Sequence, residues 1–139
     1  MSEYRDLRSA EIADVLEIQD VFARYTYLMD TKRLEEWYEL FTADCTYIVH
    51  GREYQGREGV REMVGLAAPE GTHVVAAPTI RVTGDHATAA QTFIAISADK
   101  KSFRSGWYED ELTKVDGRWR ISVRACSFVR SDGSIRPAK

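Results

Sequence analysis

Hydrophobic positions in the first third of the chain recur every three or four residues, which is the spacing of an amphipathic α-helix. Ser9 precedes them and is a suitable N-cap residue. On a helical wheel, Glu17, Asp20 and Arg24 lie opposite the apolar side chains. We therefore predict a long helix in the first third of the chain, with Ser9 as its N-cap and an apolar face that includes Ile12, Val15, Leu16, Phe22, Ala23 and Met29.

Two further helices and a strand are predicted before residue 70. Apolar and aromatic residues share one side of a helix over residues 34–41. Residues 45–49 are rich in β-forming side chains and are followed by Gly51, which predicts a strand that ends there. A third helix is expected over residues 57–66.

Beyond residue 71 the pattern changes to that of long antiparallel strands. Gly84-Asp85 and Asp116-Gly117 are turn signals, and the second is typical of a two-residue hairpin. Pro78 predicts a bulge or an edge position in the first strand. Helices followed by an antiparallel meander indicate an α+β fold with helices on one face of a curved sheet. The expected strands are 72–83, 87–98, 103–115 and 118–130, followed by a loose tail.

Composition and charge narrow the class of protein. The chain has 139 residues, of which 44% are hydrophobic and 29% charged, and we expect one domain, 1–139, with a core over about 10–130. No apolar run could span a bilayer, and two cysteines form no disulfide framework, so a cytoplasmic location is expected. A net charge of −3 gives no reason to expect nucleic acid or a membrane as partner.

Arginines are concentrated near the C-terminal end of the chain. The even-numbered Arg118, Arg120, Arg124 and Arg130 would share one face of a strand. That row could bind an anion or RNA, but we favour a solvated or subunit-facing sheet surface, because no RNA-binding motif accompanies it. A long sheet with an open outer face also leads us to expect a homo-oligomer, a dimer or a trimer.

Several site types have no matching motif. The sequence contains no phosphate-binding glycine loop, no HExxH or CxxC metal motif and no G-x-S-x-G nucleophile motif. The three histidines are spaced unlike metal ligands. We therefore predict no metal and no cofactor, which leaves acid–base chemistry or simple binding.

Two residues are candidates for acid–base chemistry. Asp30 follows Ile12 by 18 residues, five helical turns, so it returns to the predicted apolar line. A carboxylate there needs a donor or a charge, although Asp30 or Thr31 could instead cap the second helix. His73 opens a predicted core strand and could act as a base beside a carboxylate, or could be a structural histidine.

Short motifs follow one another along the chain at residues 25–32, 37, 40–45, 56–60, 71–75, 84–89 and 114–119. Their order resembles that of SnoaL-like proteins in the NTF2-like superfamily. No single motif is specific, but the ordered set covers residues 12 to 130. The resemblance implies an NTF2-like (cystatin-like) cone, in which N-terminal helices pack against a curved, mostly antiparallel sheet around a pocket.

The pattern is nearest to scytalone dehydratase and bile-acid 7α-dehydratase, which are cofactor-free lyases with an Asp–His pair. By motif match the resemblance implies that Asp30 and His73 are catalytic, and that Tyr25 matches a catalytic tyrosine. Arg130 resembles a pocket arginine of the same enzymes. As further substrate-binding candidates we add Tyr47, whose phenol could polarise a carbonyl, and Trp107 as a pocket wall.

The chain also departs from those enzymes. Residues 102–108 hold no counterpart of a second histidine of scytalone dehydratase, and Ala95 stands where the bile-acid enzyme has an acidic residue. We expect a dehydratase-type lyase acting on a small apolar cyclic substrate, namely a polyketide, aromatic or steroid-like ketone. The alternatives are an isomerase or cyclase, or a non-catalytic ligand-binding or assembly module such as the small subunit of a ring-hydroxylating dioxygenase.

Overall fold

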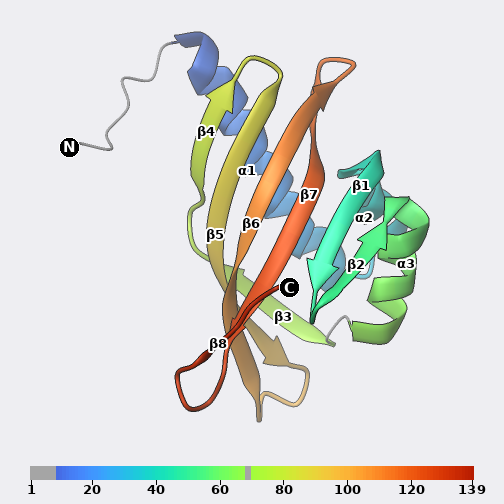
Figure 1. The fold of residues 1–139 in the computed structure, drawn as a ribbon, viewed down its shortest axis with the longest axis vertical. Coiled ribbons are helices and arrows are strands. Elements are labelled where there is room, and N and C mark those ends of the chain that lie inside the picture. The colour runs from blue at the N-terminus through green and yellow to red at the C-terminus, as the bar shows by residue number, and fades with distance from the viewer. Residues whose placement is uncertain (1–8, 68–69) are drawn as a thin grey trace, which may run out of the picture.

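The protein is described here by a computed structural model that covers residues 9–67 and 70–139. Three helices, α1 (Ser9–Asp30), α2 (Leu34–Tyr38) and α3 (Gly56–Ala67), are combined with eight strands (Figure 1). The strands are β1 (Phe41–Val49), β2 (Arg52–Gln55), β3 (Gly71–Val75), β4 (Thr79–Thr83), β5 (His86–Ser97), β6 (Phe103–Val115), β7 (Arg118–Val129) and β8 (Ile135–Arg136).

All eight strands belong to one curved sheet in the order β2-β1-β7-β6-β5-β3, with β4 also paired to β5 and β8 to β7. Among the strand pairs formed by residues 9–67 and 70–139, only β1–β7 is parallel. Helix α1 runs across one face of the sheet, and α3 packs against β1 and β2 (Figure 1). The predicted α+β arrangement of helices on a curved, mostly antiparallel sheet is confirmed.

Helix α1 buries a different face from the one predicted. Ile12 is 43% exposed and Leu16 is 60% exposed, so the expectation that both face the core is wrong. The buried stripe is centred roughly 140° from Ile12 on a helical wheel. Its members recur at helical spacing over the second half of the helix: Ile18, Val21, Phe22, Tyr25, Leu28 and Met29.

Several element boundaries also differ from the prediction. Helix α2 ends at Tyr38, and Phe41 already begins β1. The predicted strand 72–83 is divided into β3 and β4 around Pro78, which has no N–H to give to a ladder. Strands β2 and β8 were not predicted, and β8 pairs with β7 inside the expected loose tail.

A β-bulge in β7 reverses which side chains face the core. The β6–β7 register skips Ser122. Before the bulge the odd-numbered Trp119 and Ile121 are buried, whereas after it the even-numbered Arg124 and Cys126 are buried. An extra residue shifts a strand's alternation by one position, so the prediction of an outward-facing Arg124 is wrong.

An aromatic cluster joins the helices to the inner face of the sheet. The Trp37 ring lies 5.1 Å from that of Tyr25 and 4.9 Å from that of Phe41, centroid to centroid. Both distances are typical of stabilising aromatic pairs. This cluster fixes the end of α1 that holds the candidate site. None of the described helices combines the length and apolarity needed to cross a membrane.

Candidate active site

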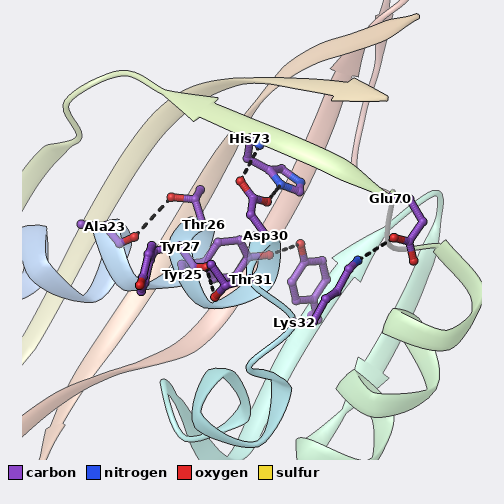
Figure 2. Close-up of polar contacts among 10 residues, drawn as sticks. Ala23, Tyr25, Thr26, Tyr27, Asp30, Thr31, Lys32, Glu70 and His73 are labelled. Carbon is purple, nitrogen blue, oxygen red and sulfur yellow. Dashed lines mark hydrogen bonds and ion pairs between the residues drawn. The ribbon is translucent and has the colours of Figure 1, made fainter. Parts of the chain in front are cut away.

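Asp30 and His73 contact each other through two hydrogen bonds (Figure 2). Asp30 is the last residue of α1, and His73 lies in β3. The Nδ1 atom of His73 is 2.6 Å from Oδ1 of Asp30, and the backbone N–H of His73 donates to Oδ2 at 2.8 Å. The side chain of His73 is 8% exposed and that of Asp30 is 19% exposed. The carboxylate therefore orients both the ring and the strand that holds it.

The alternative interpretation of Asp30 as a helix cap is wrong. Arg33 precedes α2, and no side chain caps this helix. The Thr31 hydroxyl donates instead to the Tyr27 carbonyl at 2.6 Å. With both carboxylate oxygens of Asp30 directed at His73, its polar contacts serve the histidine rather than a helix end.

The position of β3 explains how His73 reaches the helix end. Gly71, with φ +139°, lies so close to β5 that a Cβ there would be 1.9 Å from the Ile96 carbonyl oxygen. This close approach pairs His73 with Ala95 in the register. With Nδ1 facing the carboxylate, the neutral ring has its lone pair on Nε2, which has no hydrogen-bond partner among the residues described. That atom is available as a base.

A narrow cavity of about 50 Å³ adjoins the histidine. His73 forms part of its wall, and the exposed residues His50 and Arg104 form part of its outer rim. Most of the remaining wall is apolar, which favours a hydrophobic ligand. The apolar wall residues include Met29, Val49, Met63, Phe93, Ala95 and Phe128.

Two tyrosine hydroxyls face each other in the same cavity. The Tyr25 and Tyr47 oxygens are 2.8 Å apart, and both side chains are buried. Burial raises the pKa of Tyr25, although the Arg124 charge opposes the rise, and burial raises the pKa of Tyr47 well above its usual value. Both groups therefore stay protonated near neutral pH, as hydrogen-bond donors.

A fully buried ion pair lies behind these tyrosines. Arg124 donates to both carboxylate oxygens of Asp110, at 2.6 and 2.9 Å, and neither side chain is exposed. The guanidinium carbon is 4.1 Å from the centroid of the Tyr25 ring and 3.9 Å from that of Tyr108. Burial raises the pKa of Asp110, and Arg124 opposes that rise. The pair holds two cavity tyrosines from behind by cation–π contacts.

Two of the expected substrate-binding residues lie outside this cavity. Trp107 alternates with the buried Tyr108 on β6, so it faces away from the cavity. Arg130 follows the end of β7, is exposed, and donates to the Ile135 carbonyl at 2.5 Å. Neither residue lines the cavity, whereas Tyr25, Tyr47 and His73 do.

Sequence reasoning missed several residues that the fold brings to this region. Arg124 was assigned to the outer face because the bulge was not anticipated. Arg104 and Tyr108 are an even number of residues apart on the same strand, so the alternation of side chains alone could have placed Arg104 on the inner face. No signal in the sequence placed His50 beside the cavity. Within the described ranges, no three His, Cys, Asp or Glu side chains form a cluster that could hold a metal ion.

Comparisons with known proteins agree with this fold. An uncharacterized Mycobacterium tuberculosis protein, Rv2910c, is 28% identical over 130 residues, covering 85% of this chain and 87% of its own. The structure of a second protein from that organism, Rv3472, of unknown function, is 31% identical with a TM-score of 0.77, covering 91% and 79%. A Novosphingobium aromaticivorans structure provisionally named scytalone dehydratase is 22% identical with a TM-score of 0.76, covering 96% of each chain.

The family comparison covers most of the same region. The family described as SnoaL-like domain matches residues 10–125, which include α1, the Asp30–His73 contact and all strands up to the middle of β7. A cystatin-like fold is also the description of a Nostoc punctiforme structure that is 20% identical, with a TM-score of 0.77 over 91% of this chain and 97% of its own. This chain belongs to the SnoaL-like domain family, with the NTF2-like, cystatin-like fold.

Proposed function

We propose that this protein is a cofactor-independent lyase that dehydrates a cyclic ketone, with His73 as its base. The observation that supports this most strongly is the two-point contact between Asp30 and His73 at an apolar cavity. A carboxylate that fixes the histidine tautomer and balances the imidazolium charge is the arrangement that general-base catalysis needs.

The first step is removal of a proton from carbon. Nε2 of His73 takes the proton from a carbon next to the substrate carbonyl, and the electron pair of the C–H bond moves into the enolate. The apolar wall increases the strength of charge interactions by keeping water away. The positive charge that forms on His73 is stabilised by Asp30 at 2.6 Å.

The second step expels the hydroxyl group. The enolate electron pair forms the carbon–carbon double bond as the bond to the β-hydroxyl breaks, and that oxygen leaves as water. The proton taken by His73 is returned to this oxygen, so that ketone plus base yields enone, water and the same base. The Tyr25–Tyr47 hydroxyl pair is protonated and can donate a hydrogen bond to the enolate oxygen.

The same fold is found in proteins named for elimination reactions. One structural neighbour is provisionally named scytalone dehydratase, and another is named hexachlorocyclohexane dehydrochlorinase, with 16% identity and a TM-score of 0.74. At these identities the likeness is one of fold. The proposal extends elimination chemistry to this chain on the basis of its own acid–base pair.

A dehydration assay tests the proposal. Purified protein is incubated with a panel of cyclic β-hydroxyketones, and enone absorbance together with the mass loss of one water reports product. We expect His73→Ala to lower the rate by at least about 100-fold with an unchanged circular dichroism spectrum. His86→Ala is the matched control, because His86 is exposed and outside the cavity. Equal rates for the wild type and a folded His73→Ala variant would contradict the mechanism.

A further inference from the structure

We infer that the cavity selects a substrate that carries a carboxylate. Arg104 binds this carboxylate at the cavity rim while His73 removes a proton from the carbon next to the ketone. This inference rests on the proposed function and specifies its substrate class. It depends on the place of Arg104 in the sheet, on the charges around it, and on the apolar ring it covers.

His73, Ala95 and Arg104 form one row across three neighbouring strands. His73 pairs with Ala95, and Ala95 pairs with Arg104, in the β3–β5–β6 register. All three line the cavity, so their side chains face the same side of the sheet. Neighbouring strands are about 4.8 Å apart, which puts the backbones of His73 and Arg104 about 10 Å apart. Ala95 is the smallest side chain that could separate them.

The row has no large side chain between the base and the cation. The methyl group of Ala95 takes up little room between the two larger side chains. Because Ala95 is uncharged, no negative charge at this position neutralises the guanidinium of Arg104. A cyclic ketone with a carboxylate on the far side of its ring matches this spacing.

The rim around Arg104 is positively charged. Arg104 is exposed, and in the described part of the chain it has no acidic partner. Its guanidinium carbon lies 5.3 Å from the centroid of the Phe128 ring. Arg136 pairs with Phe128 in the β7–β8 register and is also exposed. His50 stacks on the same ring at 5.0 Å.

The charges of Arg104 and Arg136 change the pKa of a group at the rim, and the charge of Arg104 also acts on a thiol inside the cavity. Burial lowers the pKa of His50, and the charges of Arg136 and Arg104 lower it further. Burial raises the pKa of the Cys126 thiol inside the cavity to about 12, although Arg124 and then Arg104 oppose the rise. The field of Arg104 therefore acts on groups in the wall.

A carboxylate suits this position better than an uncharged group. The planar guanidinium offers paired N–H donors that match the two oxygens of a carboxylate. The ring of Phe128, which contacts both Arg104 and His50, provides an apolar surface for the adjoining part of the ligand. A neutral ligand would leave the cationic rim without a counter-charge.

A matched pair of probes tests the inference by binding alone. The probes are 1-oxoindane-5-carboxylate, whose carboxylate lies across the fused ring from the carbon next to the ketone, and its primary amide. They share one cyclic ketone and differ by one charge. Calorimetry gives both dissociation constants for the wild type, Arg104→Gln and Arg118→Gln. Arg118 is an exposed arginine outside the cavity, so its variant changes the net charge equally. The Ala95→Leu variant places a larger side chain between His73 and Arg104. Its dissociation constants show whether the probes bind at this place.

We expect the wild type to bind the carboxylate at least about 10-fold more tightly than the amide. Arg104→Gln should reduce this preference to about two-fold or less, Arg118→Gln should keep it, and Ala95→Leu should weaken both probes. Equal binding of the two probes by the wild type, a preference that survives Arg104→Gln, or no carboxylate binding at millimolar concentration would each overturn the inference. Stronger competition by inorganic phosphate than by acetate would also overturn it, in favour of a phosphoryl group.

This design separates the inference from the proposed function. Binding requires no turnover, so a preference for the carboxylate that depends on Arg104 stands even where the dehydration assay fails. Conversely, dehydration of an uncharged ketone with no carboxylate preference would leave the role of His73 intact and remove the substrate class.

Discussion

Asp30 contacts His73 through two different atoms of the histidine, its ring nitrogen at 2.6 Å and its backbone N–H at 2.8 Å. These residues are separated by 43 positions in the sequence. One carboxylate therefore joins the end of α1 to β3 and sets the ring orientation at the same time. A change at Asp30 should affect chemistry more than stability, because the backbone contact tolerates a neutral acceptor.

Asp30→Asn tests the electrostatic part of this contact. The amide oxygen can still accept from the backbone N–H of His73, but the negative charge beside the ring is lost. We expect turnover to fall by at least about 100-fold, because the imidazolium formed during proton transfer is no longer balanced. Steady-state rates and thermal unfolding should be measured together.

Asp20→Asn is the matched control for that variant. Asp20 is an exposed residue of the same helix and pairs with Arg24 at 2.8 Å. Exposed pairs of this kind contribute about 1 kcal/mol or less, so both rate and stability should be close to the wild type. A folded Asp30→Asn protein with the activity of Asp20→Asn would show that the charge plays no part.

The buried tyrosines predict a loss of stability at alkaline pH. The pKa of Tyr25, Tyr47 and Tyr108 is raised above 10.0 in the folded state, first of all by burial. Their contribution is complete below pH 10 and is lost as the pH rises above it, because the unfolded chain releases these protons first. Each tyrosine lowers the free energy of unfolding by up to about 1.4 kcal/mol per pH unit in that range.

Urea unfolding near pH 8 and near pH 11 measures this effect. The Tyr25→Phe/Tyr47→Phe double variant should lose less stability between the two pH values than the wild type does, because two of the groups are absent. Tyrosinate absorbance in the folded protein should appear later in the titration than in the urea-unfolded chain. Identical losses for the two proteins would refute the assignment.

The Arg124–Asp110 pair predicts strong and non-additive effects on stability. Arg124→Met leaves a buried carboxylate without its partner and should lower the free energy of unfolding by about 3–5 kcal/mol. Adding Asp110→Leu should recover part of that loss, because no buried charge then remains. Arg24→Met is the control, since Arg24 and its partner Asp20 are exposed and it should cost about 1 kcal/mol or less. Denaturant titrations of the wild type, Arg124→Met, Asp110→Leu and the double variant decide whether the two losses are additive.

Much of the fold could be predicted because local signals were strong. The strand predicted over residues 103–115 matches β6, and the Asp116-Gly117 turn has both residues at positive φ, 51° and 78°. The Ser122 bulge left no comparable signal, so Arg124 was placed on the wrong face. Strand β8 is only two residues long and depends on its pairing with β7, which no local pattern encodes.

The candidate site could be predicted only in part. Asp30 and His73 were identified individually, but each retained a structural alternative, because residues far apart in sequence meet only through the packing of α1 on β3. The resemblance to the family linked them. It also suggested Arg130, which lies outside the cavity because β7 has ended before it. Arg104 was missed, although its parity on β6 agreed with Tyr108.

Solvent-deuterium exchange into a cyclic ketone tests most directly whether His73 removes a carbon-bound proton. The wild type, His73→Asn and His86→Asn are incubated with 1-oxoindane-5-carboxylate and uncharged ketones in heavy water, and mass spectrometry follows incorporation next to the carbonyl. We expect exchange well above the uncatalysed rate with the wild type and His86→Asn, and a fall of at least about 100-fold with His73→Asn. Exchange that is undiminished in folded His73→Asn, or absent for ketones shown to bind the wild type, would contradict the account.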